Sequence, residues 1–84
     1  MKNELDYERE ITEIVNQISN VPLKEDILLY ATHDECEVGL DVLCNQLDEN
    51  GIKISKTVFD RIKYIAESLE MKKEVWEPLE PLVE

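Results

Sequence analysis

Residues 34–50 read DECEVGLDVLCNQLDEN, and two side-chain patterns run through this stretch at helical spacing. Apolar side chains recur every third or fourth position, as on the buried face of an amphipathic helix. This apolar row consists of Cys36, Leu40, Leu43, Cys44 and Leu47. A polar row with the same spacing consists of Asp34, Glu37, Asp41, Asn45 and Asp48. The stretch therefore predicts one helix with a buried face and an acidic face, and Asp34 is its expected N-cap.

The residues that follow predict where this helix ends and where another begins. Gly51 suits the end of the helix over residues 34–50, and Ser55 suits the N-cap of the helix after it. The inward side chains of this later helix are expected to be Val58, Phe59, Ile62, Ile65, Ala66 and Leu69. Residues 72–84 contain two prolines and Trp76, and they predict one short helical turn that packs over the other helices.

Two further helices are predicted before residue 34. The first is expected over residues 4–19 with Asn3 as N-cap, and the second begins near Pro22, which a first helical turn tolerates. Their inward side chains are expected to be Tyr7, Ile11, Ile14, Val15 and Ile18 in the first, and Leu23, Ile27, Leu28 and Ala31 in the second. The sequence thus predicts an all-α fold, a small four-helix bundle with a short C-terminal helical turn or tail docked on it, as a single domain over residues 1–84.

Composition limits the partners that such a domain can have. The 84 residues include 9 basic and 20 acidic side chains, which gives a net charge of −11. A chain with this charge is repelled by phosphate backbones and by anionic membrane surfaces. We therefore expect neither nucleic acid nor membrane as a partner. Because the sequence also contains no apolar run suited to a signal peptide or a membrane span, we expect a cytoplasmic protein.

Residues able to carry out catalysis are few. His33 is the only histidine, and its neighbour Cys36 is assigned to the buried face, where a thiol is not activated. His33 and Glu37 have the i, i+4 spacing of two metal ligands on a helix, but no third and fourth ligand can be named. Cys36 and Cys44 are separated by about 12 Å of helical rise, which is too far for a disulfide. We expect no catalytic residue, no metal and no cofactor, so that the function is recognition and not enzymatic.

Residues 36–83 contain a pattern of side chains that resembles that of a known family. The matching positions are Gly39, Leu40, Val42, Leu43, Cys44, Leu47, Ile52, Ile54, Trp76 and Leu79. Their order is a glycine-containing helix with a Leu-Cys-x-x-Leu segment, a short turn with isoleucine, a second helix and a C-terminal Trp-x-x-Leu. This pattern resembles that of the MafI family of small bacterial immunity proteins. The resemblance implies an immunity protein that binds and neutralises a cognate secreted toxin domain encoded beside it.

The resemblance also suggests what the acidic side chains contact. Toxins of polymorphic and contact-dependent growth-inhibition systems are often nucleases, including EndoU-like ribonucleases, and nucleases have basic substrate grooves. An acidic helix face would cover such a groove or its rim, with steering of the encounter by charge. The expected toxin-binding residues are Asp34, Glu35, Glu37, Asp41, Asp48 and Glu49. Tyr30 or Tyr64 is a candidate apolar anchor.

Two rival classes stay open from the sequence: an acidic helical adaptor or nucleic-acid mimic that binds a basic host protein through the same face, and an undetected enzyme with a pocket around His33. The acidic face also suits an ordinary solvated helix face. An adaptor would bind several basic proteins with similar strength, whereas an immunity protein has one cognate partner. The sequence leaves open whether the chain is a monomer or a homodimer.

Overall fold

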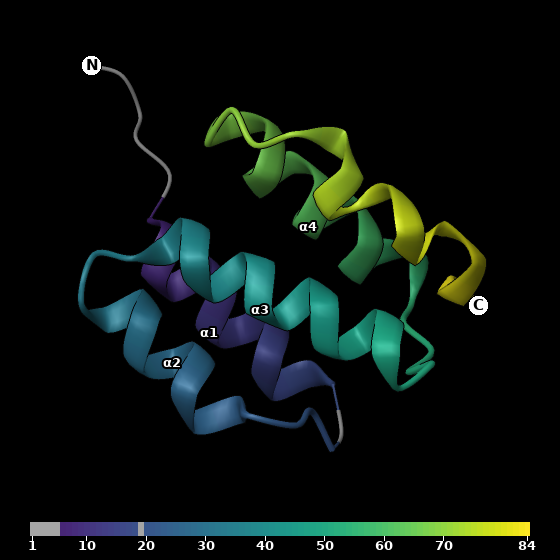
Figure 1. The fold of residues 1–84 in the computed structure, drawn as a ribbon, viewed down its shortest axis with the longest axis horizontal. Coiled ribbons are helices and arrows are strands. Elements are labelled where there is room, and N and C mark those ends of the chain that lie inside the picture. Colours follow the sequence, from purple (N-terminus) through teal and green to yellow (C-terminus); the bar gives the residue numbers. More distant parts are fainter. Residues whose placement is uncertain (1–5, 19) are drawn as a thin grey trace.

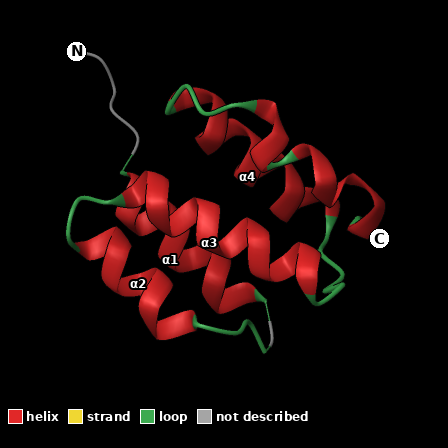
Figure 2. Cartoon of the chain, viewed as in Figure 1, coloured by secondary structure: helices red, strands yellow, loops and turns green. Residues whose placement is uncertain are grey.

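The computed structural model describes residues 6–18 and 20–84, and in these residues the chain is helical throughout its regular elements. The four α-helices are α1 (Tyr7–Gln17), α2 (Lys24–Thr32), α3 (Cys36–Glu49) and α4 (Lys56–Ser68). Two 3₁₀ segments follow, η1 (Lys73–Val75) and η2 (Glu77–Leu82). The described residues contain no strand, as Figure 2 shows, so the predicted all-α bundle with a docked C-terminal tail is confirmed.

The helices α1, α2 and α3 pack against one another, and α4 and the tail lie on the other side of α1 and α3 (Figure 1). The sides that face inward form a single apolar core. Its fully buried members are Ile11, Ile14, Val15, Ile27, Leu40, Leu43, Leu47, Ile62, Ile65, Ala66 and Leu79. All four α-helices and η2 contribute to this list, which is how a chain this short removes enough apolar surface from water to fold.

The helices α2 and α3 share the most extensive contact of the helix pairs, and Gly39 allows their backbones to approach. A Cβ atom at Gly39 would lie 3.2 Å from the carbonyl oxygen of Ile27 and 3.3 Å from the Cβ of Tyr30. The backbone of α3 therefore rests almost directly on α2 at this point. A larger residue would push the pair apart, since packed interiors leave little free volume.

Two of the helices start with side-chain caps. The Asp6 carboxylate accepts a hydrogen bond of 3.1 Å from the backbone N–H of Arg9, so α1 begins at Tyr7. The predicted cap of this helix, Asn3, lies outside the described residues. Ser55 accepts a hydrogen bond of 3.1 Å from the backbone N–H of Val58 at the start of α4, which confirms the prediction for that residue.

The start of α3 differs from the prediction, because Asp34 ends α2 and does not cap α3. Asp34 has a φ of 63°, and the N–H of Glu35 donates a 2.9 Å hydrogen bond to the carbonyl oxygen of Tyr30. This is the Schellman arrangement, in which a left-handed residue just past a helix lets the next N–H satisfy one of the last carbonyls. Glu35 is the N-cap residue of α3 and provides no side-chain cap.

The start of α2 also differs from the prediction. Leu23 was expected to face inward, but it adopts a left-handed φ of 61° as N-cap residue and its side chain is 51% exposed. Pro22 precedes the helix and is not part of its first turn, which begins at Lys24. The left-handed step turns the chain before α2, and it directs the side chain of Leu23 away from the core that Ile27 and Ala31 enter.

The tail closes the side of the core formed by α3 and α4. Trp76 is 7% exposed and meets Phe59 edge to face, with ring centroids 6.0 Å apart, and the Lys63 ammonium lies 4.8 Å from the centroid of the indole. Backbone hydrogen bonds join Ile54 to Leu82 and Glu84, so the end of the tail pairs with the loop after α3. Docking of the tail is as predicted, but it uses two 3₁₀ segments instead of one turn.

Candidate protein-binding surface

The six acidic residues predicted to bind a toxin are all exposed, and we refer to them together as the α3 acidic face. Its members are Asp34, Glu35, Glu37, Asp41, Asp48 and Glu49. The first two lie in the turn before α3, and the other four lie on the helix itself. At 3.6 residues per turn, Glu37, Asp41 and Asp48 fall in one row along the helix, which fulfils the predicted periodicity.

None of these six carboxylates forms an ion pair with another residue in the described ranges 6–18 and 20–84. Two of the three acidic residues of α1 are different in this respect. Arg61 of α4 donates hydrogen bonds of 2.6 Å to Glu10 and 3.0 Å to Glu13, and Arg9 also reaches Glu13. Charge is thus balanced locally between α1 and α4, whereas the α3 acidic face has no basic partner among the residues that the structure describes.

Two pKa values reflect the hydrogen bonds that Arg61 of α4 donates to Glu10 and Glu13 of α1, which we call the Arg61 clamp. The hydrogen bonds from Arg61 and Arg9 hold the pKa of Glu13 below its ordinary value, because they stabilise the ionised carboxylate. The hydrogen bond to Glu10 raises the pKa of Arg61 above its ordinary value. The hydrogen bonds from Arg61 to Glu10 and Glu13 join α4 to α1, so the role of these groups is structural.

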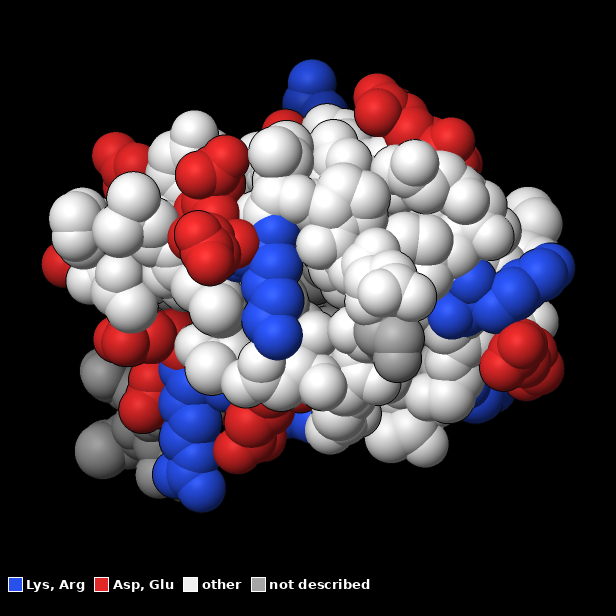
Figure 3. All heavy atoms as spheres, turned by 90° about the horizontal axis from the view of Figure 1, so that it is seen from below, with Lys and Arg blue, Asp and Glu red and all other residues white. Residues whose placement is uncertain are grey.

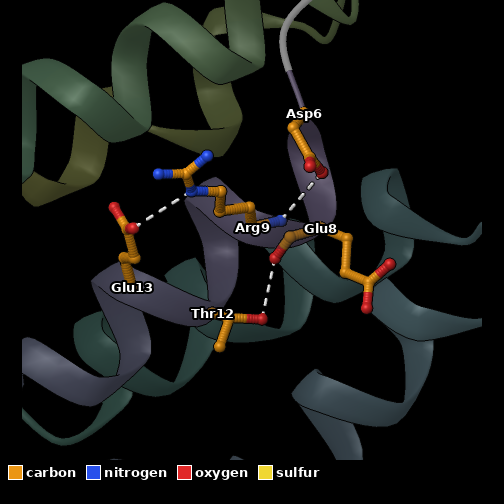
Figure 4. Close-up of a pocket in the computed structure, with 5 residues that line it drawn as sticks. All are labelled: Asp6, Glu8, Arg9, Thr12 and Glu13. Carbon is orange, nitrogen blue, oxygen red and sulfur yellow. Dashed lines mark hydrogen bonds and ion pairs between the residues drawn. The ribbon is translucent and has the colours of Figure 1, made fainter.

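A hollow on α1 belongs to the same local arrangement. Its lining residues are Asp6, Glu8, Arg9, Thr12 and Glu13. Figure 4 shows that their polar groups bond to one another: Thr12 donates 2.7 Å to the carbonyl of Glu8, and Arg9 contacts both Asp6 and Glu13. Because these bonds are those of a capped and paired helix start, the hollow leaves few polar groups to receive a ligand.

Two other hollows lie beside the α3 acidic face, and both are lined by Glu37 and Val38. The first is lined by Tyr7, Asp34, Glu35, Cys36, Glu37, Val38 and Leu69. The second is lined by Glu37, Val38, Asp41, Met71, Lys72 and Val75. Val38 is 44% exposed and lines both hollows, so an exposed apolar side chain lies among the carboxylates at the N-terminal half of α3.

Sequence reasoning missed Val38 and named two tyrosines as apolar anchors instead. Tyr64 is 60% exposed on α4, and Tyr30 is half-buried beneath the backbone of Gly39. Neither lines the hollows on α3. The signal for Val38 was nevertheless present, because it falls between Glu37 and Asp41, outside the apolar row that forms the core.

Neither of the two cysteine thiols is activated. Cys36 is half-buried with its thiol 3.6 Å from the carbonyl oxygen of Ala31, and burial together with Asp34 raises its pKa. Burial raises the pKa of Cys44 to about 12. His33 is exposed at the C-cap of α2. In the part of the chain that the structure describes, no three His, Cys, Asp or Glu side chains gather as metal ligands would.

The charged groups are unevenly spread. Figure 3 shows one face of the molecule, on which acidic side chains stand in separate groups around a largely uncharged middle, with isolated basic side chains between them. Among the described helices, none is both long enough and apolar enough to cross a membrane.

Comparison with known protein families finds none that this chain matches. Searches of curated proteins and of solved structures likewise find no match. The resemblance to the MafI family therefore stays a prediction from the residues named above.

Proposed function

We propose that this chain is an immunity protein, which binds a cognate bacterial toxin domain through the α3 acidic face and neutralises it. The toxin is expected to be a nuclease with a basic groove, such as an EndoU-like ribonuclease. The observation that carries the proposal is that all six carboxylates of this face are exposed and have no basic partner among the described residues. The resemblance to the MafI family supports the choice of partner.

The position of two of these acids adds support. Asp48 and Glu49 lie in the last turn of α3, where the helix carries partial negative charge and basic residues are favoured. That turn contains no basic residue. Placing two carboxylates there costs stability, and no ion pair within the described residues offsets the cost. A binding partner with positive charge gives these residues a reason to be acidic.

The proposed mechanism follows from charge and shape. A negative face attracts a basic groove over a distance comparable to the Debye length, about 8–10 Å at physiological salt, and so speeds the encounter. Once seated, the bundle occupies the space that RNA phosphates would take along the groove. Neutralisation in this scheme needs no chemical step, only a complex that dissociates slowly.

The first test is growth rescue and pull-down with the toxin-like domain encoded beside this chain's gene. We expect rescue of cells that express the toxin domain, and a tight complex whose association slows as salt increases. Binding to several unrelated basic proteins with similar strength would instead indicate an adaptor or nucleic-acid mimic. Absence of both rescue and binding, with the chain folded and helical, would overturn the proposal.

A charge-reversal pair then locates the contact. Asp41→Lys with Asp48→Lys should slow association and flatten its salt dependence, because both residues belong to the acidic row of α3. The matched control is Glu25→Lys with Glu67→Lys, which changes the net charge equally at exposed positions on α2 and α4. Equal effects of the two pairs would show that only net charge matters and would remove the α3 acidic face from the interface.

A further inference from the structure

Val38 has an environment that helix stability does not explain. It is exposed to 44%, it is β-branched, and such residues are weaker helix formers than the straight-chain residues that usually occupy solvated positions. Asp41 lies one turn along α3 from Val38, while Asp34 and Glu35, in the turn before the helix, line one of the hollows together with Val38. An exposed aliphatic side chain is thus held at the surface beside several carboxylates.

The two hollows beside Val38 extend this apolar spot across three segments that are distant in sequence. Tyr7 comes from the start of α1, Leu69 from the end of α4, and Met71 and Val75 from the beginning of the tail. All four are partly buried and pack against the core while still lining the hollows. The floor is therefore built on core-packed groups, which makes it a formed surface rather than a single protruding side chain.

The charges around the hollows are strongly one-sided. Their lining residues include four carboxylates, on Asp34, Glu35, Glu37 and Asp41, and one ammonium, on Lys72. Lys72 forms no ion pair with these acids in the described part of the chain. An apolar floor with a negative rim is complementary to an aliphatic side chain flanked by cations.

We infer that the Val38 hollows form the short-range anchor of the interface, and that they seat a basic segment of the partner with an aliphatic side chain on Val38 and lysine or arginine against the surrounding carboxylates. This inference rests on the proposed function and makes it more specific. It assigns the lasting contact to the N-terminal half of α3 and to the adjoining tail.

The other end of the helix then has a different task. Asp48 and Glu49 lie 10 or 11 residues beyond Val38, which is about 15 Å along the helix and longer than the Debye length at physiological salt. They line neither hollow. Their charge acts on the approaching partner and contributes little once the anchor is seated. Substitutions in the N-terminal half of α3 should therefore change the dissociation rate, whereas substitutions of Asp48 and Glu49 should change the association rate.

The experiment measures association and dissociation rates of the toxin-like domain encoded beside this chain with three variants. Val38→Ala should speed dissociation about tenfold and leave association unchanged, since the loss of a buried aliphatic group is worth on the order of one decade. Asp48→Asn with Glu49→Gln should slow association and leave dissociation unchanged. Leu29→Ala is the matched control, because Leu29 is an exposed aliphatic residue on α2 that lines neither hollow.

Equal dissociation rates for Val38→Ala and Leu29→Ala would overturn the inference, while binding of the unmodified chain would still uphold the proposed function. If the toxin-like domain does not bind at all, the hollows are tested with a short synthetic lysine–leucine peptide and methyl NMR. Saturable shifts at Val38, Met71 and Val75, with Leu29 unmoved, would support the anchor without the toxin. Similar shifts at all exposed methyl groups would overturn it. Circular dichroism of each variant confirms that the bundle is intact.

Discussion

The thiol of Cys44 lies in the core, and its burial makes the free energy of unfolding decrease at alkaline pH. Burial raises the pKa of Cys44 from an ordinary value of 9.0 to about 12. Between these values the unfolded chain loses the thiol proton while the folded chain keeps it. The contribution of Cys44 to the free energy of unfolding is therefore complete below about pH 9. It falls as the pH rises further, by up to about 1.4 kcal/mol per pH unit.

Urea unfolding at several pH values, with Cys44→Ala as the reference, checks this prediction. Lysines and tyrosines also titrate above pH 9, but they do so in both proteins and cancel in the difference. The free-energy advantage of the parent chain over Cys44→Ala should shrink as the pH rises from about 9 to 11. An advantage that stays constant over this range would show that the thiol ionises in the folded state as it does in the unfolded chain.

Gly39 leads to a second prediction about a single side chain. Replacing a helical glycine normally improves helix propensity, by up to about 1 kcal/mol for alanine. Here the space is missing, because even a Cβ would lie 3.2 Å from the Ile27 carbonyl oxygen. Gly39→Leu should therefore destabilise the fold by about 1–3 kcal/mol or more. Thermal unfolding measures this loss of stability. The control is Asn45→Leu, which places the same side chain on the exposed face of α3. A Gly39→Leu protein that is as stable as the control would show that α2 can move away without cost.

The helix ends show where sequence reasoning worked and where it failed. Ser55 and Gly51 were predicted as a start and a stop, because each residue type has one strong local use: a hydroxyl cap, and a left-handed φ, here 59°. Asp34 and Glu70 also adopt a left-handed φ after a helix. Aspartate suits an N-cap equally well, so its sequence position alone could not decide between the two roles. The outcome depended on Tyr30, whose carbonyl receives the hydrogen bond that closes α2.

The last turn of α3 permits a test of whether its acids are there for function. Glu49→Lys replaces a carboxylate with an ammonium at the negative end of the helix dipole, and should stabilise the fold by about 0.3–1 kcal/mol at low salt. The same change should slow association with a basic partner. Chemical denaturation and binding kinetics on one preparation measure both effects. A variant that is more stable and binds equally fast would leave the acidity of this turn unexplained by binding.

Over the whole molecule, the sequence predicted the acidic face better than the apolar surface beside it. The periodicity of α3 is local, so the exposure of Glu37, Asp41 and Asp48 followed directly from helical spacing. The hollows beside Val38 require Tyr7, Leu69 and Val75 to come together from three other segments. That depends on how α1, α4 and the tail dock, which spacing along one helix does not encode.

The charge of the whole molecule leads to the last prediction. The excess of 20 acidic over 9 basic residues opposes compaction by mutual repulsion, whereas the five ion pairs of residues 6–18 and 20–84 favour it. Salt weakens both contributions, so the sign of the salt effect shows which is larger. Most of these pairs are exposed on at least one side and are worth at most about 1 kcal/mol each. We expect repulsion to dominate and sodium chloride to raise the melting temperature by several degrees, as a change of about 1 kcal/mol would.

Glu25→Lys with Glu67→Lys provides the control for that measurement. The two reversals bring the net charge from −11 to −11 + 4 = −7 without touching an ion pair or the α3 acidic face. With less repulsion to screen, the variant should melt higher at low salt and gain less when salt is added. A melting temperature that falls with salt in both proteins would show that the Arg61 clamp and the other pairs outweigh repulsion. The unpartnered acids of α3 would then be tolerated at little cost, and their position would no longer argue for a basic partner.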